Sequence, residues 1–343
     1  MNRNQFFLAI TVLIIAFYAS WENNRQETYT KDRMTVFIAE IDSLQKVVAS
    51  IDSSSRAQDS LQWNYFNYTS FNLHGKFICL GQEVDFDREI IRERVEYEIY
   101  RFLRFRGRIH EWLKRMGRYG PLIDPIMAEH NLTYDFRWLA VIEGLLDPNS
   151  VSPTGPKGMW QFTRKTGQAY GLGQNYYRDQ RKDPWRSTKA ARNHLVDLYG
   201  VGWLQGDGGP GFHDMWLTLA AYNAGPGVIN TATRVEKTRD FWALKSIRNE
   251  TRRYVPQFIA LCYIMSHLEE FGFDEIDPYR PIPNFRDTVV TLTGPNNSLG
   301  DLAAAAGVDF DNFILLNTDY EVVTLPAGSY QVKTTLPDSA NLK

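Results

Sequence analysis

The 343-residue sequence has little cysteine and little net charge, and each shortage excludes a class of protein. Its two cysteines, Cys79 and Cys262, are too few for a disulfide framework or a zinc site. Because Cys262 lies in an apolar, helix-like run, we expect two buried free thiols, with a single bridge as the alternative. A formal net charge of -2 gives no electrostatic sign of nucleic-acid binding, so no nucleic-acid partner is expected.

The N-terminus resembles an export signal but lacks two features of a processed one. In residues 1–21, Arg3 precedes an apolar run over 6–21. Phe17 and Tyr18 occupy the places where a cleavage site has small residues, and no cysteine follows for a lipoprotein anchor. We therefore favour an uncleaved signal-anchor over a cleaved signal peptide, with the rest of the chain exported.

Two polar-rich stretches come before the first strongly apolar helix. Residues 22–84 read as a polar, serine-rich spacer, with a short amphipathic helix predicted over 34–51. Residues 85–130 interleave arginine and glutamate with apolar residues at helical spacing, which predicts an N-terminal helical extension with an ion-paired, solvated face. The pair Gly120-Pro121 predicts a helix break within it.

One carboxylate, Glu143, lies in a short helix that is apolar on nearly every face from Trp138 to Leu146. Such a helix is expected to be buried, and carboxylates are rarely buried without a partner. Asp147-Pro148 ends the helix, which places Glu143 in its last turn, at the negative end of the helix dipole. Both features raise a carboxyl pKa, as a general acid requires. The alternative is a structural glutamate bonded to backbone or arginine.

Three further stretches carry polar side chains at the ends of apolar segments. The loop 148–162, rich in glycine and proline, contains Trp160 and Gln161, candidates for stacking on and bonding to a ligand, with core packing as the alternative. A helix ended by Gly225-Pro226 carries Tyr222 and Asn223, and a last apolar helix carries Tyr254. We expect these groups to converge with the acid on one cleft.

These motifs together carry a family resemblance. Glu143 and the segments 155–162, 221–225 and 250–258, in this order, resemble the soluble-lytic-transglycosylase family with its goose-lysozyme-like fold. Residues 112–134 are similar to membrane-bound lytic murein transglycosylases. The resemblance implies a mainly α, lysozyme-like catalytic domain over 131–275. It implies neither a cofactor nor a metal site.

The last part of the chain, residues 284–336, reads as strand, helix, helix, strand. It is similar to the LysM-like modules that follow the catalytic domain in this family and bind glycans containing N-acetylglucosamine. The resemblance therefore implies a small α+β glycan-binding module. A packing or partner-binding module is the alternative.

The resemblance also implies a reaction. The substrate would be the glycan strand of peptidoglycan, cut between N-acetylmuramic acid and N-acetylglucosamine in the periplasm of a bacterial cell envelope, with the N-terminal anchor in the membrane. Glu143 would act first as acid and then as base, giving a 1,6-anhydro sugar without water. The sugars would be held by the side chains of Gln161, Tyr222, Asn223 and Tyr254, with Trp160 as a further candidate.

Two departures from the family pattern keep other functions open. Gly144 replaces the usual serine after the acid, and Thr163-Arg164 replaces the usual Met-Pro. One alternative is a lysozyme-like hydrolase, for which Asp147 or Asp183 would supply a second carboxylate. The other is a catalytically degenerate wall-binding or scaffold protein, which Gly144 favours. We expect the fold to tolerate Gly144→Ser.

Overall fold

The computed structural model describes residues 73–200, 211–273 and 276–336. The predicted N-terminal signal and the predicted helix over 34–51 lie outside these residues. Within the described ranges, no helix is both long enough and apolar enough to cross a membrane. The described residues all fall within one compact unit.

The described chain begins with a hairpin that the sequence analysis missed. Strands β1 (Lys76–Cys79) and β2 (Gln82–Asp85) pair antiparallel across a two-residue turn, Leu80-Gly81, in which both residues have positive φ. Leu80 is only 2% exposed, and its amide donates to the Asp135 carboxylate at 2.7 Å. The predicted spacer therefore cannot extend to residue 84, because the hairpin is packed onto the body.

Helices α3 (Glu89–Leu103) and α4 (Arg106–Ala128) form the predicted N-terminal extension. The predicted break at Gly120-Pro121 is wrong, because α4 continues through Pro121 and Pro125. A proline costs about 3 kcal/mol in a helix interior, whereas burying one large apolar side chain contributes about 1.5–3 kcal/mol. A stripe of such side chains offsets the prolines here: Ile109, Trp112, Met116, Tyr119, Ile123, Ile126 and Met127.

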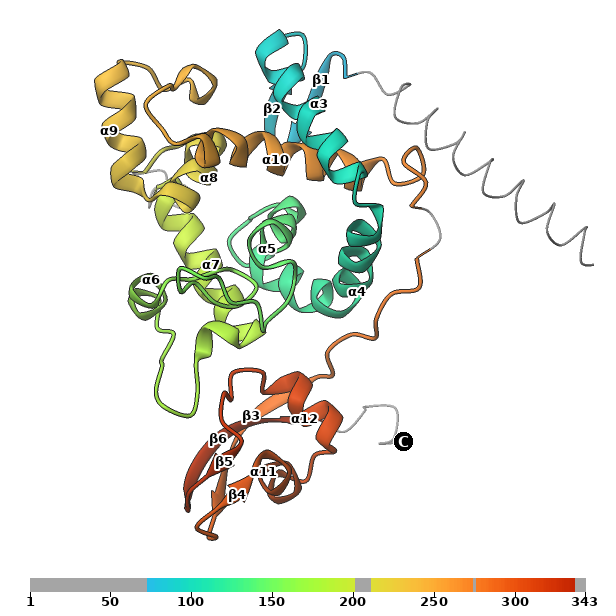
Figure 1. Cartoon of the computed structure of the whole chain (residues 1–343), viewed down its shortest axis with the longest axis vertical. Coiled ribbons are helices and arrows are strands. Elements are labelled where there is room, and N and C mark those ends of the chain that lie inside the picture. The colour runs from blue at the N-terminus through green and yellow to red at the C-terminus, as the bar shows by residue number, and fades with distance from the viewer. Residues whose placement is uncertain (1–72, 201–210, 274–275, 337–343) are drawn as a thin grey trace, which may run out of the picture. The chain divides into compact units, whose positions relative to one another are not determined.

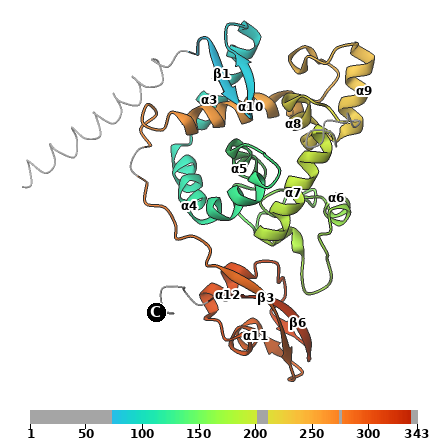
Figure 2. The same cartoon turned by 180° about the vertical axis from the view of Figure 1, so that it is seen from behind.

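Helix α5 (Arg137–Gly144) lies in the middle of the helical body, with α4, α7, α8 and α10 around it (Figures 1 and 2). Leu139, Ala140 and Val141 are fully buried, so the helix has an apolar environment as predicted. Helix α10 (Asn249–Ser266) packs against α5, α3 and α8. The short α5 is therefore held in place by its neighbours rather than by its own helical propensity.

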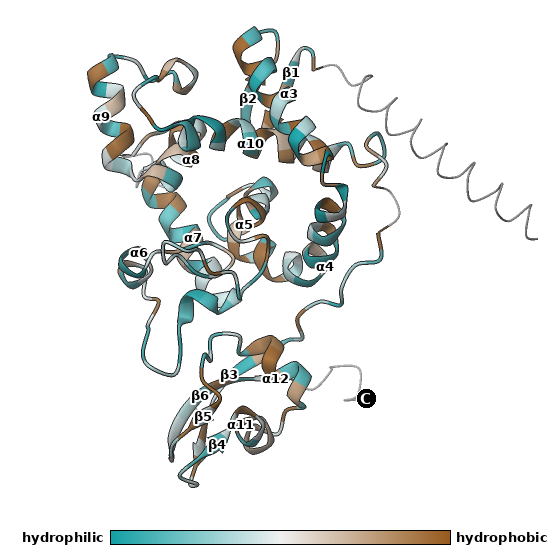
Figure 3. Cartoon of the chain, viewed as in Figure 1, coloured by the Kyte–Doolittle hydropathy of each residue, from teal (hydrophilic) through white to brown (hydrophobic). Residues whose placement is uncertain are grey.

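The remaining helices complete this body. Aspartates cap two of them, since Asp183 and Asp214 accept bonds from the first-turn amides of α7 and α8. Helices α9 and α10 show both hydrophilic and hydrophobic colours, as half-buried helices should (Figure 3). These remaining helices are η1 (Tyr134–Phe136), α6 (Arg164–Ala169), η2 (Gln180–Lys182), α7 (Pro184–Tyr199), α8 (Met215–Ala224), α9 (Pro226–Glu236) and η4 (Phe241–Ala243).

The C-terminal module has strands and helices in the predicted order. Strands β3 (Phe285–Leu292) and β6 (Gly328–Thr335) pair antiparallel, and the short strands β4 (Asn297–Ser298) and β5 (Thr324–Leu325) pair with each other. Helices α11 (Leu299–Ala306) and α12 (Phe310–Leu316) lie between them in the chain. Their core residues are Val290, Leu292, Leu302, Ala303, Val308, Phe313, Tyr320, Leu325 and Val332.

Two predictions are confirmed at this level. The described chain is mainly α-helical with a small α+β part, as the fold class required. Cys79 and Cys262 are buried free thiols, so the alternative of a bridge is wrong.

Candidate active site

A cavity of about 460 Å³ opens beside the C-terminal end of α5. Every residue proposed for the site from the sequence lines it, together with others that were not proposed. They come from the loop before α6 and from the helices α5, α6, α7, α8 and α10. The lining residues are Ile142, Glu143, Ser152, Thr154, Pro156, Trp160, Gln161, Phe162, Thr163, Thr166, His194, Tyr222, Asn223, Glu250, Tyr254 and Gln257.

Glu143 occupies the last turn of α5, as predicted. The helix ends because Leu145 and Leu146 both adopt left-handed φ, 57° and 52°, and their amides donate back to Val141 and Ala140. This sharp termination leaves the Glu143 carboxyl at the cavity instead of continuing the helix past it.

The electrostatics of Glu143 suit an acid that works near neutral pH. Burial, and to a smaller extent the negative charge of Glu250, raise its pKa from 4.5 to about 7. The Tyr254 hydroxyl donates a hydrogen bond to the Glu143 carboxylate, which lowers the pKa and partly opposes burial. Burial is the largest effect, so the pKa of the carboxyl stays well above the ordinary glutamate value.

The two polar residues at the end of α8 reach the cavity as expected. The Tyr222 hydroxyl donates to the Trp160 carbonyl at 3.0 Å, and Asn223 accepts a bond from Thr251 at 2.8 Å. Helix α8 stops at Gly225, which has a φ of 89°, and Pro226 starts the next helix. Tyr222 and Asn223 are therefore fixed in place by contacts with neighbouring elements.

We define residues 150–163, which run along one side of the cavity, as the cleft loop. Within it, Gln161 has a positive φ of 47°. Its side-chain amide nitrogen, Nε2, donates to the Gly158 carbonyl at 2.8 Å. The stacking role expected for Trp160 is wrong, because its side chain is 0% exposed and its indole donates to Thr188. The packing alternative holds for Trp160, whose carbonyl accepts the hydrogen bond from Tyr222.

The second carboxylate is neither of the two considered from the sequence. Asp183 is 0% exposed and pairs with Lys333, and Asp147 lies 3.6 Å from Arg115. Instead, Glu250 lines the cavity from the first turn of α10, on the same helix face as Tyr254 and Gln257. The spacing of these three residues in the sequence was the available signal.

His194 is another cavity residue that the sequence analysis missed. Its Nδ1 lies 3.0 Å from the Tyr170 hydroxyl, which donates to Asp197 at 2.9 Å. Since that hydroxyl gives its proton to Asp197, it accepts from His194, and Nδ1 carries the imidazole proton. Burial lowers the pKa of His194 to about 4, so the ring is neutral at physiological pH. A lone histidine on an amphipathic helix gave no sequence signal.

Gly144 has a packing role that explains why no serine stands there. A Cβ on Gly144 would lie 2.5 Å from the Gly158 carbonyl oxygen and 2.6 Å from the Met159 Cα. These are backbone atoms of the cleft loop, which cannot move aside as a flexible side chain would. The expectation that the fold tolerates serine at this position is therefore wrong, and the glycine is no longer a sign of a degenerate site.

The sequence of the helical body matches a known family. Residues 128–245 match the family described as the transglycosylase SLT domain. Over these residues the chain is similar to that family. The match contains Glu143, the cleft loop and the end of α8, while α10 with Tyr254 follows it in the chain.

Relatives of the SLT domain extend the match to more of the chain. Membrane-bound lytic murein transglycosylase D of Escherichia coli (strain K12) is 30% identical over 248 residues, covering 70% of this chain and 51% of that protein. Membrane-bound lytic murein transglycosylase F of Klebsiella pneumoniae is 29% identical over 181 residues, covering 51% of this chain and 32% of that protein. The chain thus spans about half the length, or less, of these curated relatives.

Solved structures with an SLT-type name are more distant. The 70 kDa soluble lytic transglycosylase of Escherichia coli is 17% identical, with a TM-score of 0.37, covering 64% of this chain and 36% of that chain. A lytic transglycosylase of Pseudomonas aeruginosa is 18% identical with a TM-score of 0.34, covering 46% of this chain and 25% of that chain.

The raised pKa of Glu143 predicts a pH-dependent stability. Between its unfolded value of 4.5 and about 7, the unfolded chain binds fewer protons than the folded one, so wild type loses stability as pH rises. The side chain of Glu143→Gln does not titrate. The free energy of unfolding of this variant should therefore exceed that of wild type by about 2–3 kcal/mol at pH 8 and by little at pH 4. Urea unfolding at both pH values measures this. An equal difference at both values would contradict the raised pKa.

The close packing at Gly144 predicts that Gly144→Ser lowers stability. The new Cβ must push the cleft loop away from α5, at a cost of about 1–3 kcal/mol for an overpacked site. Thermal unfolding should therefore show a lower midpoint for this variant. Gly155→Ser is unsuitable as a control, because Gly155 has a φ of 103°, a backbone conformation in which serine would be strained. Gly107→Ser, where nothing lies within 4 Å, is the matched control and should lose far less stability.

Proposed function

We propose that this chain is a lytic transglycosylase that cleaves peptidoglycan glycan strands between N-acetylmuramic acid and N-acetylglucosamine. The observation that carries the proposal is the Glu143 carboxyl in the SLT domain, with a pKa of about 7 and a tyrosine donor, at an open cavity. A carboxyl poised near neutral pH can give a proton in one step and take one in the next.

The proposed reaction uses both forms of Glu143. The protonated carboxyl first donates to the glycosidic oxygen as the bond to the anomeric carbon breaks. The Tyr254 hydroxyl, which donates to one carboxylate oxygen, favours the proton on the other oxygen and then stabilises the anion. The carboxylate next takes the proton of the muramic acid C6 hydroxyl as that oxygen bonds to the anomeric carbon. The product is a 1,6-anhydro end, and Glu143 is again protonated.

The other lining residues would hold the sugars. Gln161, Tyr222 and Asn223 present amide and hydroxyl groups at the cavity, the donors and acceptors that sugar hydroxyl and acetamido groups need. His194, with its Nδ1 proton committed to Tyr170, offers Nε2 as an acceptor. The polar lining thus suits a carbohydrate better than an apolar ligand.

A lysozyme-like hydrolase is the second candidate, and Glu250 is the observation that favours it. Hydrolysis of a glycosidic bond usually needs a second carboxylate as base or nucleophile. Glu250 lines the same cavity as Glu143 and is close enough to raise its pKa. If Glu250 activates water, the products will carry reducing ends in place of anhydro ends.

The cellular setting is part of the proposal. A glycan-strand substrate places the enzyme in the bacterial cell envelope, on the periplasmic side. The relatives with matching sequence are named membrane-bound, and the basic start and apolar run of residues 1–21 support an N-terminal membrane anchor for this chain.

Digestion of purified sacculi in ¹⁸O-labelled water separates the two candidates. The transglycosylase should release muropeptides that end in 1,6-anhydro-muramic acid without label, as measured by mass spectrometry. Glu143→Gln should reduce this release by at least about a hundredfold, the contribution expected of a general acid. Labelled reducing ends that disappear in Glu250→Gln would establish the hydrolase instead.

A further inference from the structure

The C-terminal module is bound to the helical body through main-chain pairing. We define residues 173–183, between α6 and α7, as the bridging segment, and residues 317–321 of the module as the module turn. The Asp179 amide donates to the Asp319 carbonyl at 2.8 Å, and the Glu321 amide donates to the Tyr177 carbonyl at 2.9 Å. With the bridge between Arg178 and Tyr320, these bonds form a short antiparallel ladder.

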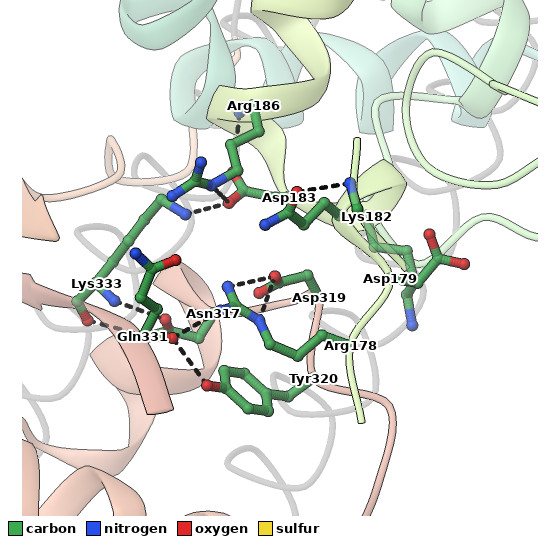
Figure 4. A network of polar contacts seen from close by, with 12 residues as sticks. Arg178, Asp179, Lys182, Asp183, Arg186, Asn317, Asp319, Tyr320, Gln331 and Lys333 are labelled. Carbon is green, nitrogen blue, oxygen red and sulfur yellow. Dashed lines mark hydrogen bonds and ion pairs between the residues drawn. The ribbon is translucent and has the colours of Figure 1, made fainter. Parts of the chain in front are cut away.

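Buried ions fix this contact. The Arg178 guanidinium donates to the Asp319 carboxylate at 2.8 Å, and Lys333 pairs with the Asp183 carboxylate (Figure 4). Asp319 and Asp183 are 0% exposed and Lys333 is 2% exposed. Each buried charge therefore has an opposite partner across the contact, and removing one partner would leave an uncompensated charge. A freely swinging tether would not need such a contact.

The bridging segment in turn holds the cleft loop. The Arg181 guanidinium donates to the carbonyls of Gly155 and Phe162, both at 3.0 Å, while it pairs with Asp179 at 2.6 Å. Arg181 is 3% exposed, so these bonds are shielded from water. Arg181 thus clamps both ends of the turn that carries Gln161.

One ion pair connects the module to the cleft loop directly. Lys157 in the cleft loop donates to Glu321 in the module at 2.6 Å and lies 3.3 Å from Asp179. The backbone beside Lys157 is ordered by two more bonds, from its amide to Phe162 at 3.1 Å and from Gly158 to Ser150 at 2.8 Å. The module therefore contacts the cleft loop directly, and the same loop lines the cavity.

Glycine contacts complete the path to the acid. A Cβ on Gly158 would lie 1.9 Å from the Arg181 carbonyl oxygen, and a Cβ on Gly144 would lie 2.5 Å from the Gly158 carbonyl oxygen. The end of α5, the cleft loop and the bridging segment thus approach backbone to backbone. Such tight packing leaves the cleft loop no free space on either side, so the position of the loop depends on the bridging segment.

We propose that the C-terminal module is a positioning element for the substrate cleft: the module turn and Glu321 hold the bridging segment and Lys157, which hold the cleft loop and Gln161 in place. Asp319 and Glu321 are then positioning residues for substrate binding. Only the effect on substrate binding rests on the proposed function. The contact between the module and the cleft loop does not depend on that function.

Glu321→Gln tests the direct contact, and Asp319→Asn tests the module turn. Amide hydrogen exchange at Lys157 and Gly158 should quicken by roughly two- to fivefold in Glu321→Gln, the loss expected from one partly exposed ion pair. It should quicken by about tenfold or more in Asp319→Asn, which leaves Arg178 unpaired. Glu83→Gln, which breaks the exposed pair with Lys76, is the matched control and should leave these amides unchanged.

Kinetics on soluble glycan strands supply the second readout. Both module variants should raise KM by factors similar to the changes in exchange, with kcat and its pH profile unchanged, because Glu143 and Tyr254 are not displaced. Glu321→Asp should restore part of the loss. If exchange at Lys157 and Gly158 and KM both match wild type in the two variants, the module does not position the cleft. A wild-type protein that makes no anhydro product, with the exchange changes intact, would refute only the proposed function.

Discussion

The burial of one carboxyl group at the end of a short apolar helix is the interaction on which the rest of the site depends. Burial raises the pKa of Glu143 to about 7, and the Tyr254 hydroxyl limits how far it rises. Neither effect would exist if α5 were at the surface, so the surrounding helices are needed for the chemistry as well as for stability. The cost of burying this acid is the source of its reactivity.

Close backbone packing is the second constraint. Gly144 lets the cleft loop lie directly on the end of α5, and Gly158 lets the same loop lie directly on Arg181. The loop therefore has little freedom on either side, although it is rich in glycine and proline. In this arrangement the acid, the loop and the module contact form one packed unit, and the module is better understood as part of the body than as an appendage.

Much of the site could be predicted from the sequence, because its residues lie at the ends of apolar helices. Glu143, Tyr222, Asn223 and Tyr254 met this condition, and all of them line the cavity. Trp160 and Gly144 were misinterpreted, since their environments are set by contacts with residues distant in the chain. The buried ion pairs of the module were missed because nothing local specifies a partner more than 100 residues away. The hairpin was missed because β1 and β2 have only four residues each, too few for a clear alternating pattern.

A direct titration of the Glu143 carboxyl tests the central claim. The measurement is the difference infrared spectrum between wild type and Glu143→Gln, followed from pH 4 to pH 9 in the carboxyl stretching region. A protonated carboxyl band should persist at pH 6 and disappear with a midpoint near pH 7. A midpoint at the ordinary glutamate value of 4.5 would contradict it, since Glu143 would then be ionised and unable to donate the first proton.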